Sequence, residues 1–159
     1  MKKLILMRHA LPEGGTAGLR DKDRGLTPEG QNQCRHARQY IVKNDLVPDL
    51  VLCSSATRTR QTFAHMNIPV ERIEYQDTLY LPTREKIIQA IHDVFDPGIE
   101  TLMVITHYPG VVDFAAHISG SDAFDHGYPE GGISIFNCGI KDWQNLSPSS
   151  IDLEVFQVF

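Results

Sequence analysis

Short apolar runs that end abruptly in polar residues recur along the chain. The three clearest runs, each given with the polar pair that follows it, are Lys3–Met7 before Arg8-His9, Leu50–Cys53 before Ser54-Ser55, and Leu102–Ile105 before Thr106-His107. Apolar runs of this length, bounded by turn residues, are typical of strands that are buried on both faces. The pattern therefore predicts three central strands.

Segments with helical spacing separate these runs. The clearest is Thr27–Asn44, in which Thr27 is suited to the N-cap and Pro28 to the first helical position. An apolar stripe at Cys34, Ala37 and Ile41 gives this segment one buried face. Similar patterns predict helices over Thr57–Met66, Thr83–Val94 and Pro109–Ser119. Strands that alternate with helices indicate a parallel sheet.

Further strands are expected outside this alternation. Val70–Tyr75 is a weaker strand, and no clear helix separates Ile133–Cys138 from Ile151–Phe159, so these last two are expected to form an antiparallel addition. No repeat, low-complexity tract or linker divides the chain. We therefore predict one α/β domain over residues 1–159, a three-layer α/β/α structure with a mostly parallel central sheet.

Composition narrows the range of partners. Of the 159 residues 42% are apolar, and the formal net charge of −5 provides no overall positive field for nucleic acid or an anionic membrane. Cys34, Cys53 and Cys138 are widely spaced, which disfavours a disulfide framework or a cysteine zinc site. The apolar runs are too short for a signal peptide or a bilayer span. We expect a cytoplasmic protein that binds neither nucleic acid nor membranes.

The polar residues behind the three central strands are the candidate site. Ligands of open parallel sheets bind beyond the carboxyl ends of the strands, where Arg8, His9, Arg58 and His107 are expected to converge. Two arginines and two histidines would form a cationic pocket on an acidic protein. Such a pocket suits a dianionic phosphoryl group, because the planar arginine fork binds two oxygens at once.

His9 is the candidate nucleophile. A neutral imidazole that donates its Nδ1–H to a backbone carbonyl leaves Nε2 free to attack phosphorus, and this chemistry requires no metal or cofactor. The attack would give a phosphohistidine that water later hydrolyses, while Arg8, Arg58 and His107 hold the phosphoryl oxygens. Thr16, which follows two glycines, is a further candidate phosphate ligand, although a mobile surface loop is the simpler interpretation.

Four sequence elements resemble those of the histidine phosphatase superfamily, whose members have the phosphoglycerate mutase-like fold. They are Arg8-His9-Ala10 for the family's Arg-His-Gly, Asp23–Gly30 for the stretch that leads into its first helix, Ser54–Thr62 for its Ser-x-x-x-Arg-x-x-Gln-Thr element, and Ile105–Gly110 for its second-histidine element. Ala10 and Tyr108 depart from the family's usual glycine and asparagine. The resemblance implies that Arg58 is the second phosphate-binding arginine.

Within this superfamily the short chain resembles the SixA-type phosphohistidine phosphatases, whose sites lack the covering insertions of larger relatives. An uncovered site admits a phosphorylated protein side chain, so the expected partner is a phosphohistidine-bearing protein. A small phosphomonoester as substrate, or a phosphate-binding module without turnover, are the alternatives. The proton donor for the leaving group is open, with Glu13, Asp77, Glu85 or no residue at all as the choices.

Overall fold

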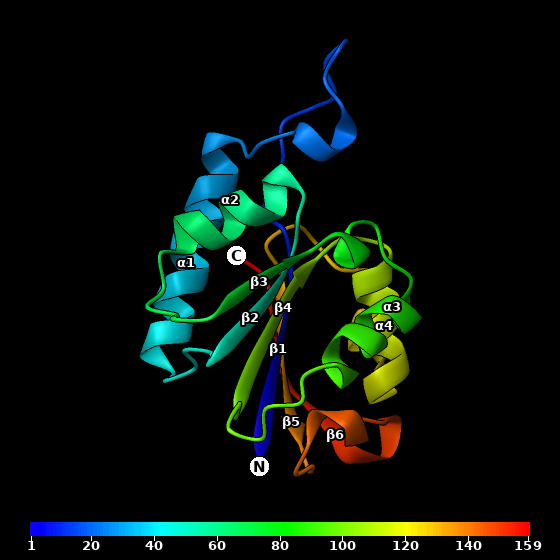
Figure 1. The fold of residues 1–159 in the computed structure, drawn as a ribbon. Coiled ribbons are helices and arrows are strands. Elements are labelled where there is room, and N and C mark those ends of the chain that lie inside the picture. The colour runs from blue at the N-terminus through cyan, green and yellow to red at the C-terminus, as the bar shows by residue number, and fades with distance from the viewer.

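A six-stranded sheet forms the centre of the protein in the computed structural model, which describes residues 1–159 (Figure 1). The strands are β1 (Lys2–Arg8), β2 (Leu50–Ser54), β3 (Ile73–Gln76), β4 (Thr101–Thr106), β5 (Ile133–Cys138) and β6 (Ile151–Gln157). Their order across the sheet is β3-β2-β4-β1-β5-β6. The first four strands are mutually parallel, whereas β5 is antiparallel to both β1 and β6. The predicted sheet with its antiparallel addition is confirmed.

Four helices cover the two faces of this sheet. They are α1 (Pro28–Lys43), α2 (Thr57–Met66), α3 (Arg84–His92) and α4 (Gly110–Ser119). Figure 1 shows α1 and α2 together on one face and α3 and α4 together on the other. The cap expected for α1 is present, since the Thr27 side chain accepts a hydrogen bond from the Gly30 amide at 3.0 Å. The fold is therefore the predicted three-layer α/β/α domain.

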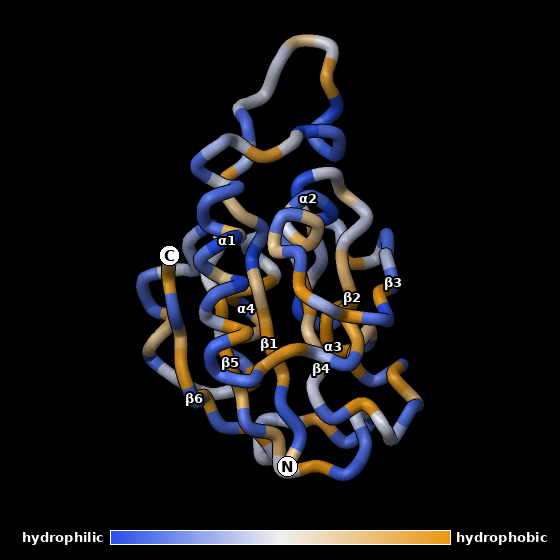
Figure 2. The backbone as a smooth tube through the Cα atoms, turned by 90° about the vertical axis from the view of Figure 1, so that its left-hand side faces the viewer, coloured by the Kyte–Doolittle hydropathy of each residue, from blue (hydrophilic) through white to orange (hydrophobic).

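The strands are buried on both faces because their side chains alternate between two apolar clusters. In β1, Leu4 and Leu6 pack in the cluster that includes residues of α3 and α4, and Ile5 and Met7 pack in the cluster that includes residues of α1. The tube in Figure 2 is accordingly most hydrophobic along the central strands. This packing fixes where each strand ends, and so where the residues that follow it lie.

The edge strand β3 differs from its prediction. Val70–Tyr75 was expected to be a strand, but β3 begins at Ile73 and extends to Gln76. The reason is its neighbour: Val51 in β2 donates its amide to Arg72 and is in register with Ile73, so no β2 residue is available to pair with Val70. Val70 instead packs against the apolar cluster on the α1 side.

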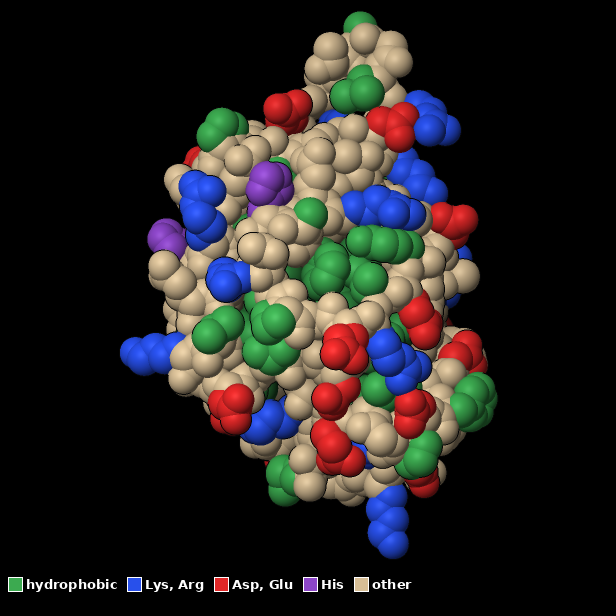
Figure 3. Space-filling model, turned by 60° about the vertical axis from the view of Figure 1, so that its left-hand side comes forward, with side chains coloured by type: hydrophobic (Ala, Val, Ile, Leu, Met, Phe, Trp, Pro, Cys, Tyr) green, Lys and Arg blue, Asp and Glu red, His purple; other side chains and the backbone are tan.

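The connection from β1 to α1 projects beyond the carboxyl edge of the sheet, at the top of Figures 1 and 2. Residues 13–20 of this connection are exposed. Figure 3 shows acidic and basic side chains interspersed on the face that it presents, without one dominant sign of charge. None of the helices has the length and apolar character needed to cross a membrane.

Candidate active site

A cavity of about 330 Å³ opens at the carboxyl edge of the parallel strands. It is lined by Arg8, His9, Pro12, Asp21, Arg24, Arg58, Leu81, His107, Tyr108 and Glu130. The cavity thus brings together Arg8 and His9 at the end of β1, Arg58 in the first turn of α2, and His107 directly after β4. The topology places them together because β1 and β2 both pair with β4 in parallel.

His9 has the geometry expected of a nucleophile. Its Nδ1 atom lies 2.8 Å from the backbone oxygen of Ala10, so Nδ1 carries the proton and Nε2 the free lone pair. The Ala10 amide donates to the Thr62 hydroxyl at 3.0 Å, which fixes this residue to α2. Burial, followed by the positive charges of Arg58 and Arg8, lowers the pKa of His9 to about 3. The imidazole is therefore neutral at physiological pH.

His107 faces His9 across the cavity. The two ring centroids are 5.2 Å apart, and the His107 Nε2 atom lies 2.7 Å from the Ser54 hydroxyl oxygen. The Tyr80 and His107 rings are nearly perpendicular, with a centroid distance of 5.4 Å. Burial and the nearby His9 and Arg58 lower the pKa of His107 to about 2, so this imidazole is also neutral in the unliganded protein.

The two arginines are held by groups that fix their orientation. Arg8 donates to the Tyr128 backbone oxygen at 2.8 Å and pairs with the Glu130 carboxylate at 3.3 Å. Arg58 donates to the backbone oxygen of Asp21 at 2.8 Å and to its carboxylate at 3.0 Å. These contacts use the terminal nitrogens of both side chains. The guanidinium groups are thus pre-oriented before any ligand binds.

Three buried nitrogens in this site have no hydrogen-bond partner. They are Nε of Arg8, Nε of Arg58 and Nδ1 of His107, and no other buried side-chain nitrogen or oxygen in the protein lacks a partner. Unpaired buried polar groups are costly, and in native proteins they often mark a place where a ligand completes the bonding. An anion with several oxygens, such as a phosphoryl group, matches this cluster of cationic and neutral nitrogens.

Two carboxylates of the cavity, Asp21 and Glu130, were missed by the sequence analysis. The Tyr80 hydroxyl donates to Asp21 at 2.6 Å, and this bond together with Arg58 lowers the pKa of Asp21 to about 2. Asp21 lies 37 positions from Arg58 in the sequence, so no local pattern links the two. Glu130 lies in a turn whose glycines account for the turn without a role in ligand binding. The only available signal was that Asp21 lies two residues before the start of the Asp23–Gly30 stretch.

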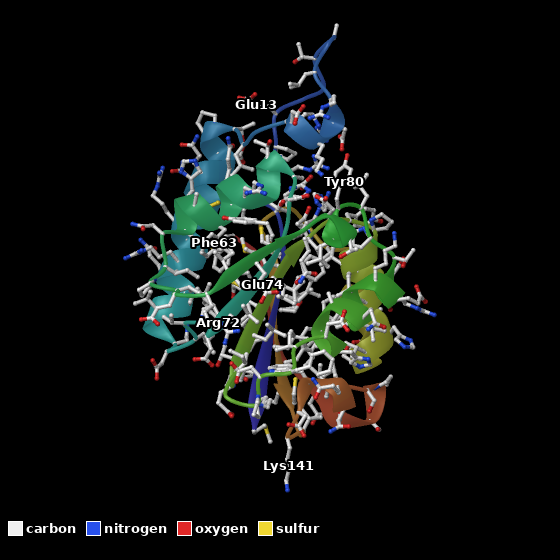
Figure 4. All side chains as sticks on the ribbon, viewed as in Figure 1. Glu13, Phe63, Arg72, Glu74, Tyr80 and Lys141 are labelled. Carbon is white, nitrogen blue, oxygen red and sulfur yellow. The ribbon has the colours of Figure 1, made fainter.

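The residues considered as proton donors lie elsewhere. Glu13 is exposed on the projecting connection, as Figure 4 shows, and Asp77 and Glu85 are exposed and paired with Lys22 and Arg84, respectively. None of the three lines the cavity. The reason is that all three lie in the exposed segments around the cavity, where the side chain is free to turn toward solvent.

Thr16 also lies apart from the other predicted phosphate ligands. It is exposed on the projecting connection, where its backbone oxygen accepts from the Leu19 amide at 3.0 Å, and it does not line the cavity. No group of three or more histidine, cysteine or carboxylate side chains lies close enough together to hold a metal ion. The cavity instead gathers three arginines and two histidines, with Asp21 and Glu130 as the carboxylates among its lining residues.

Comparisons with known proteins agree with this geometry. Residues 4–79 match the model of the histidine phosphatase superfamily (branch 1). An uncharacterized protein of Mycobacterium tuberculosis is 34% identical over 160 residues, covering 96% of this chain and 99% of that protein. The structure of a putative phosphohistidine phosphatase SixA from Nakamurella multipartitia superposes with a TM-score of 0.88 at 27% identity, covering 98% of this chain and 95% of that one.

A second solved structure supports the same assignment. The putative phosphohistidine phosphatase SixA from Agrobacterium tumefaciens has a TM-score of 0.84 at 25% identity, and the match covers 99% of each chain. The family match over residues 4–79 includes Arg8, His9 and Arg58 of the cavity, whereas His107 lies outside it. The chain belongs to the histidine phosphatase superfamily, and its activity is that of a phosphatase.

Proposed function

We propose that the protein is a SixA-type phosphohistidine phosphatase in which His9 is the nucleophile. Its Nε2 atom attacks phosphorus, the P–N bond of the substrate breaks, and the phosphoryl group passes to His9. Water then attacks the phosphohistidine intermediate and releases inorganic phosphate. Arg8, Arg58 and His107 hold the phosphoryl oxygens through both steps, so catalysis rests on positioning and electrostatic stabilisation.

The observation that carries the choice of substrate is the absence of a covering helix over the cavity. Short connections, residues 55–56 between β2 and α2 and residues 107–109 between β4 and α4, surround it. The rim side chains Leu81 and Tyr108 are about half exposed. The connection of residues 9–27 supplies Pro12, Asp21 and Arg24 to the cavity wall, and its exposed residues 13–20 project beyond the sheet edge (Figure 1). A site open in this way admits a phosphorylated side chain that is still attached to a folded protein.

The carboxylates of the cavity support a P–N bond over an alkyl phosphate. Asp21 is held ionised by its low pKa, and Glu130 is paired with Arg8, so both act as counterions of the phosphate-binding arginines. A strong general acid is needed to expel an alkoxide. Phosphohistidine needs it less, because its nitrogen leaves readily once protonated. The names of the two neighbours with at least 25% identity favour the same substrate class.

The test is parallel turnover of a phosphohistidine-bearing protein and a panel of phosphomonoesters. We expect a strong preference for the P–N bond and a loss of about four orders of magnitude or more in His9→Ala. His117→Ala is the matched control, since His117 is exposed on α4 and outside the cavity. Preference for a monoester would move the function to small-molecule metabolism. No turnover of either class would favour a phosphate-binding module.

A further inference from the structure

We propose that Ser54 is a positioning residue that fixes the tautomer of His107, so that Nδ1–H of His107 is always available to a phosphoryl oxygen. The proposal rests on the role of His107 in the proposed function and adds a residue that acts through it. Ser54 is fully buried and is the last residue of β2. It does not line the cavity, so its hydroxyl reaches the substrate only through the imidazole.

The strand register brings the two residues together. β2 and β4 are parallel neighbours, and Cys53 is opposite Ile105. Ser54 follows Cys53, and Thr106-His107 follow Ile105. Ser54 and His107 therefore lie close together at the carboxyl edge of the sheet. The Ser54 hydroxyl oxygen lies 2.7 Å from His107 Nε2. This is the shorter of the two hydrogen bonds that the imidazoles of the cavity make, since His9 Nδ1 lies 2.8 Å from the Ala10 oxygen.

The hydrogen bonds around the Ser54 hydroxyl decide which atom donates. Its oxygen accepts from the Ala56 amide at 3.3 Å, and its other hydrogen-bond partner is His107 Nε2. A hydroxyl has one proton to give, and a buried one needs an acceptor. Nε2 is the acceptor within reach, so Ser54 donates and Nε2 accepts. The proton of the neutral imidazole of His107 is then on Nδ1.

The opposite tautomer fails on two counts. If Nε2–H donated to Ser54, the buried Ser54 hydroxyl proton would have no acceptor. Nδ1, which is buried, has no protein partner and belongs to a residue that lines the cavity, would then offer a lone pair instead of a proton to an anion bound there. With Nδ1–H instead, His107 joins the unpaired Nε–H groups of Arg8 and Arg58 as a third donor to the anion.

The two histidines of the cavity consequently perform different tasks through their hydrogen-bond partners. In His9 the Ala10 carbonyl accepts from Nδ1–H, which leaves Nε2 as a nucleophile. In His107 the Ser54 hydroxyl donates to Nε2, which leaves Nδ1–H as a donor. The same side chain serves once as a nucleophile and once as a hydrogen-bond donor because a carbonyl oxygen faces one ring and a hydroxyl faces the other.

The first test is the tautomer itself, read from the ¹⁵N chemical shifts of His107 in the full-length protein. We expect Nδ1 to be of the protonated type and Nε2 of the unprotonated type in the wild type. Ser54→Ala should give a mixture or the reverse, and Ser55→Ala, whose hydroxyl contacts Asp77 instead, should match the wild type. A protonated Nε2 in the wild type would overturn the proposal whether or not the protein turns over phosphohistidine.

The second test is a double-mutant cycle on the binding of inorganic phosphate. Ser54→Ala should weaken binding and lower kcat/KM about 10–100-fold, as is typical when a partner that orients a functional imidazole is removed. In the His107→Ala background the same change should have no further effect on phosphate binding. Equal losses in both backgrounds would mean that Ser54 acts through the fold and would overturn the proposal.

A third variant guards against misfolding of Ser54→Ala. Ser54→Cys keeps the size of the side chain but replaces the hydroxyl by a weaker donor, so we expect an intermediate phosphate affinity and an intermediate mixture of tautomers. The proposal would be contradicted if Ser54→Cys had the same stability as Ser54→Ala but bound phosphate as tightly as the wild type. If His107→Ala binds phosphate like the wild type, the role of His107 fails, while the tautomer measurement still tests Ser54.

Discussion

The two ends of the sheet each hold a buried cationic side chain, and they differ in how its nitrogens are satisfied. At the amino end, Lys2 is 2% exposed and its Nζ atom contacts the backbone oxygens of Pro97 and Ile99 at 3.0 and 2.7 Å and the Glu100 carboxylate at 3.3 Å. At the carboxyl end, Arg8 and Arg58 are pre-oriented, but each keeps a buried Nε without a partner.

This difference separates a structural charge from a functional one. The ammonium of Lys2 has three protons and three acceptors, so nothing is left to bind a ligand. Each of the two guanidinium groups has a buried Nε–H without an acceptor, which costs stability. A hydrogen bond to an anion in the cavity would offset this cost. Removing a charge from the amino end should therefore change stability, whereas removing one from the carboxyl end should change activity.

Among substitutions of the charged side chains at the two ends, the largest expected effect is on activity, from Arg58→Lys. A lysine keeps the charge but loses the planar fork and the Nε–H, so we expect kcat/KM to fall by about two to three orders of magnitude. The melting temperature should change little. Arg60→Lys is the matched control two positions away, where the guanidinium lies exposed over the Tyr75 ring. Similar losses in both variants would contradict the assignment of Arg58 to phosphate binding.

The next effect is on stability, from Lys2→Met. The substitution keeps the apolar stem but leaves the Pro97 oxygen unpaired, so we expect the free energy of unfolding to fall by about 1–3 kcal/mol. Thermal denaturation measures it, and kcat/KM should remain at the wild-type value. Lys3→Met removes a neighbouring lysine that pairs with Glu154 at the surface, and should cost less than about 1 kcal/mol. A loss of activity in Lys2→Met would contradict the assignment of a structural role to the charge at the amino end.

A third effect is a pH dependence of the free energy of unfolding, which only the carboxyl end should produce. His9 and His107 have folded-state pKa values of about 3 and 2, below the ordinary value of 6.5. As the pH falls below 6.5 the unfolded chain takes up these protons and the folded protein does not, so stability is lost progressively toward pH 3.

Chemical denaturation between roughly pH 6.5 and pH 4.5, above the range where most carboxylates titrate, isolates the two histidines. Each contributes a slope of up to about 1.4 kcal/mol per pH unit, so His9→Ala should flatten the curve. Lys2→Met leaves both histidines in place and should retain the wild-type slope. An unchanged slope in His9→Ala would mean that this imidazole already accepts a proton in the folded state.

Local sequence signals were sufficient for most of the fold. Thr27 and Pro28 mark the start of α1, and the apolar runs that end at Met7 and Ile105 mark β1 and β4, because capping and burial on both faces leave patterns within a few residues. The same runs placed Arg8 and His107 at one edge. The edge strand β3 was less well predicted, since its start depends on which β2 residues are free to pair.

The carboxylates near the cavity could not be predicted in the same way. Asp21 reaches Arg58 and Tyr80 only because the long connection from β1 folds back over α2, and Glu130 reaches Arg8 from the turn before β5. Contacts of this kind depend on where a loop closes, which no short sequence pattern encodes. Glu13, Asp77 and Glu85 had equally acidic side chains but lie on exposed segments.

The sequence by itself determined the central strands, the helices and the edge at which Arg8, His9, Arg58 and His107 gather, because burial, capping and the alternation of strands with helices leave patterns within a few residues of the chain. Only the tertiary structure decided that Ser54 is the partner of His107 and that Asp21 and Glu130 hold the arginines. A carbonyl beside His9 and a hydroxyl beside His107 both place the imidazole proton on Nδ1, but they leave Nε2 of His9 free as a nucleophile and Nδ1–H of His107 free as a donor. The carbonyl belongs to the residue next to His9, whereas strand register brings Ser54 and His107 together across 53 positions of the chain.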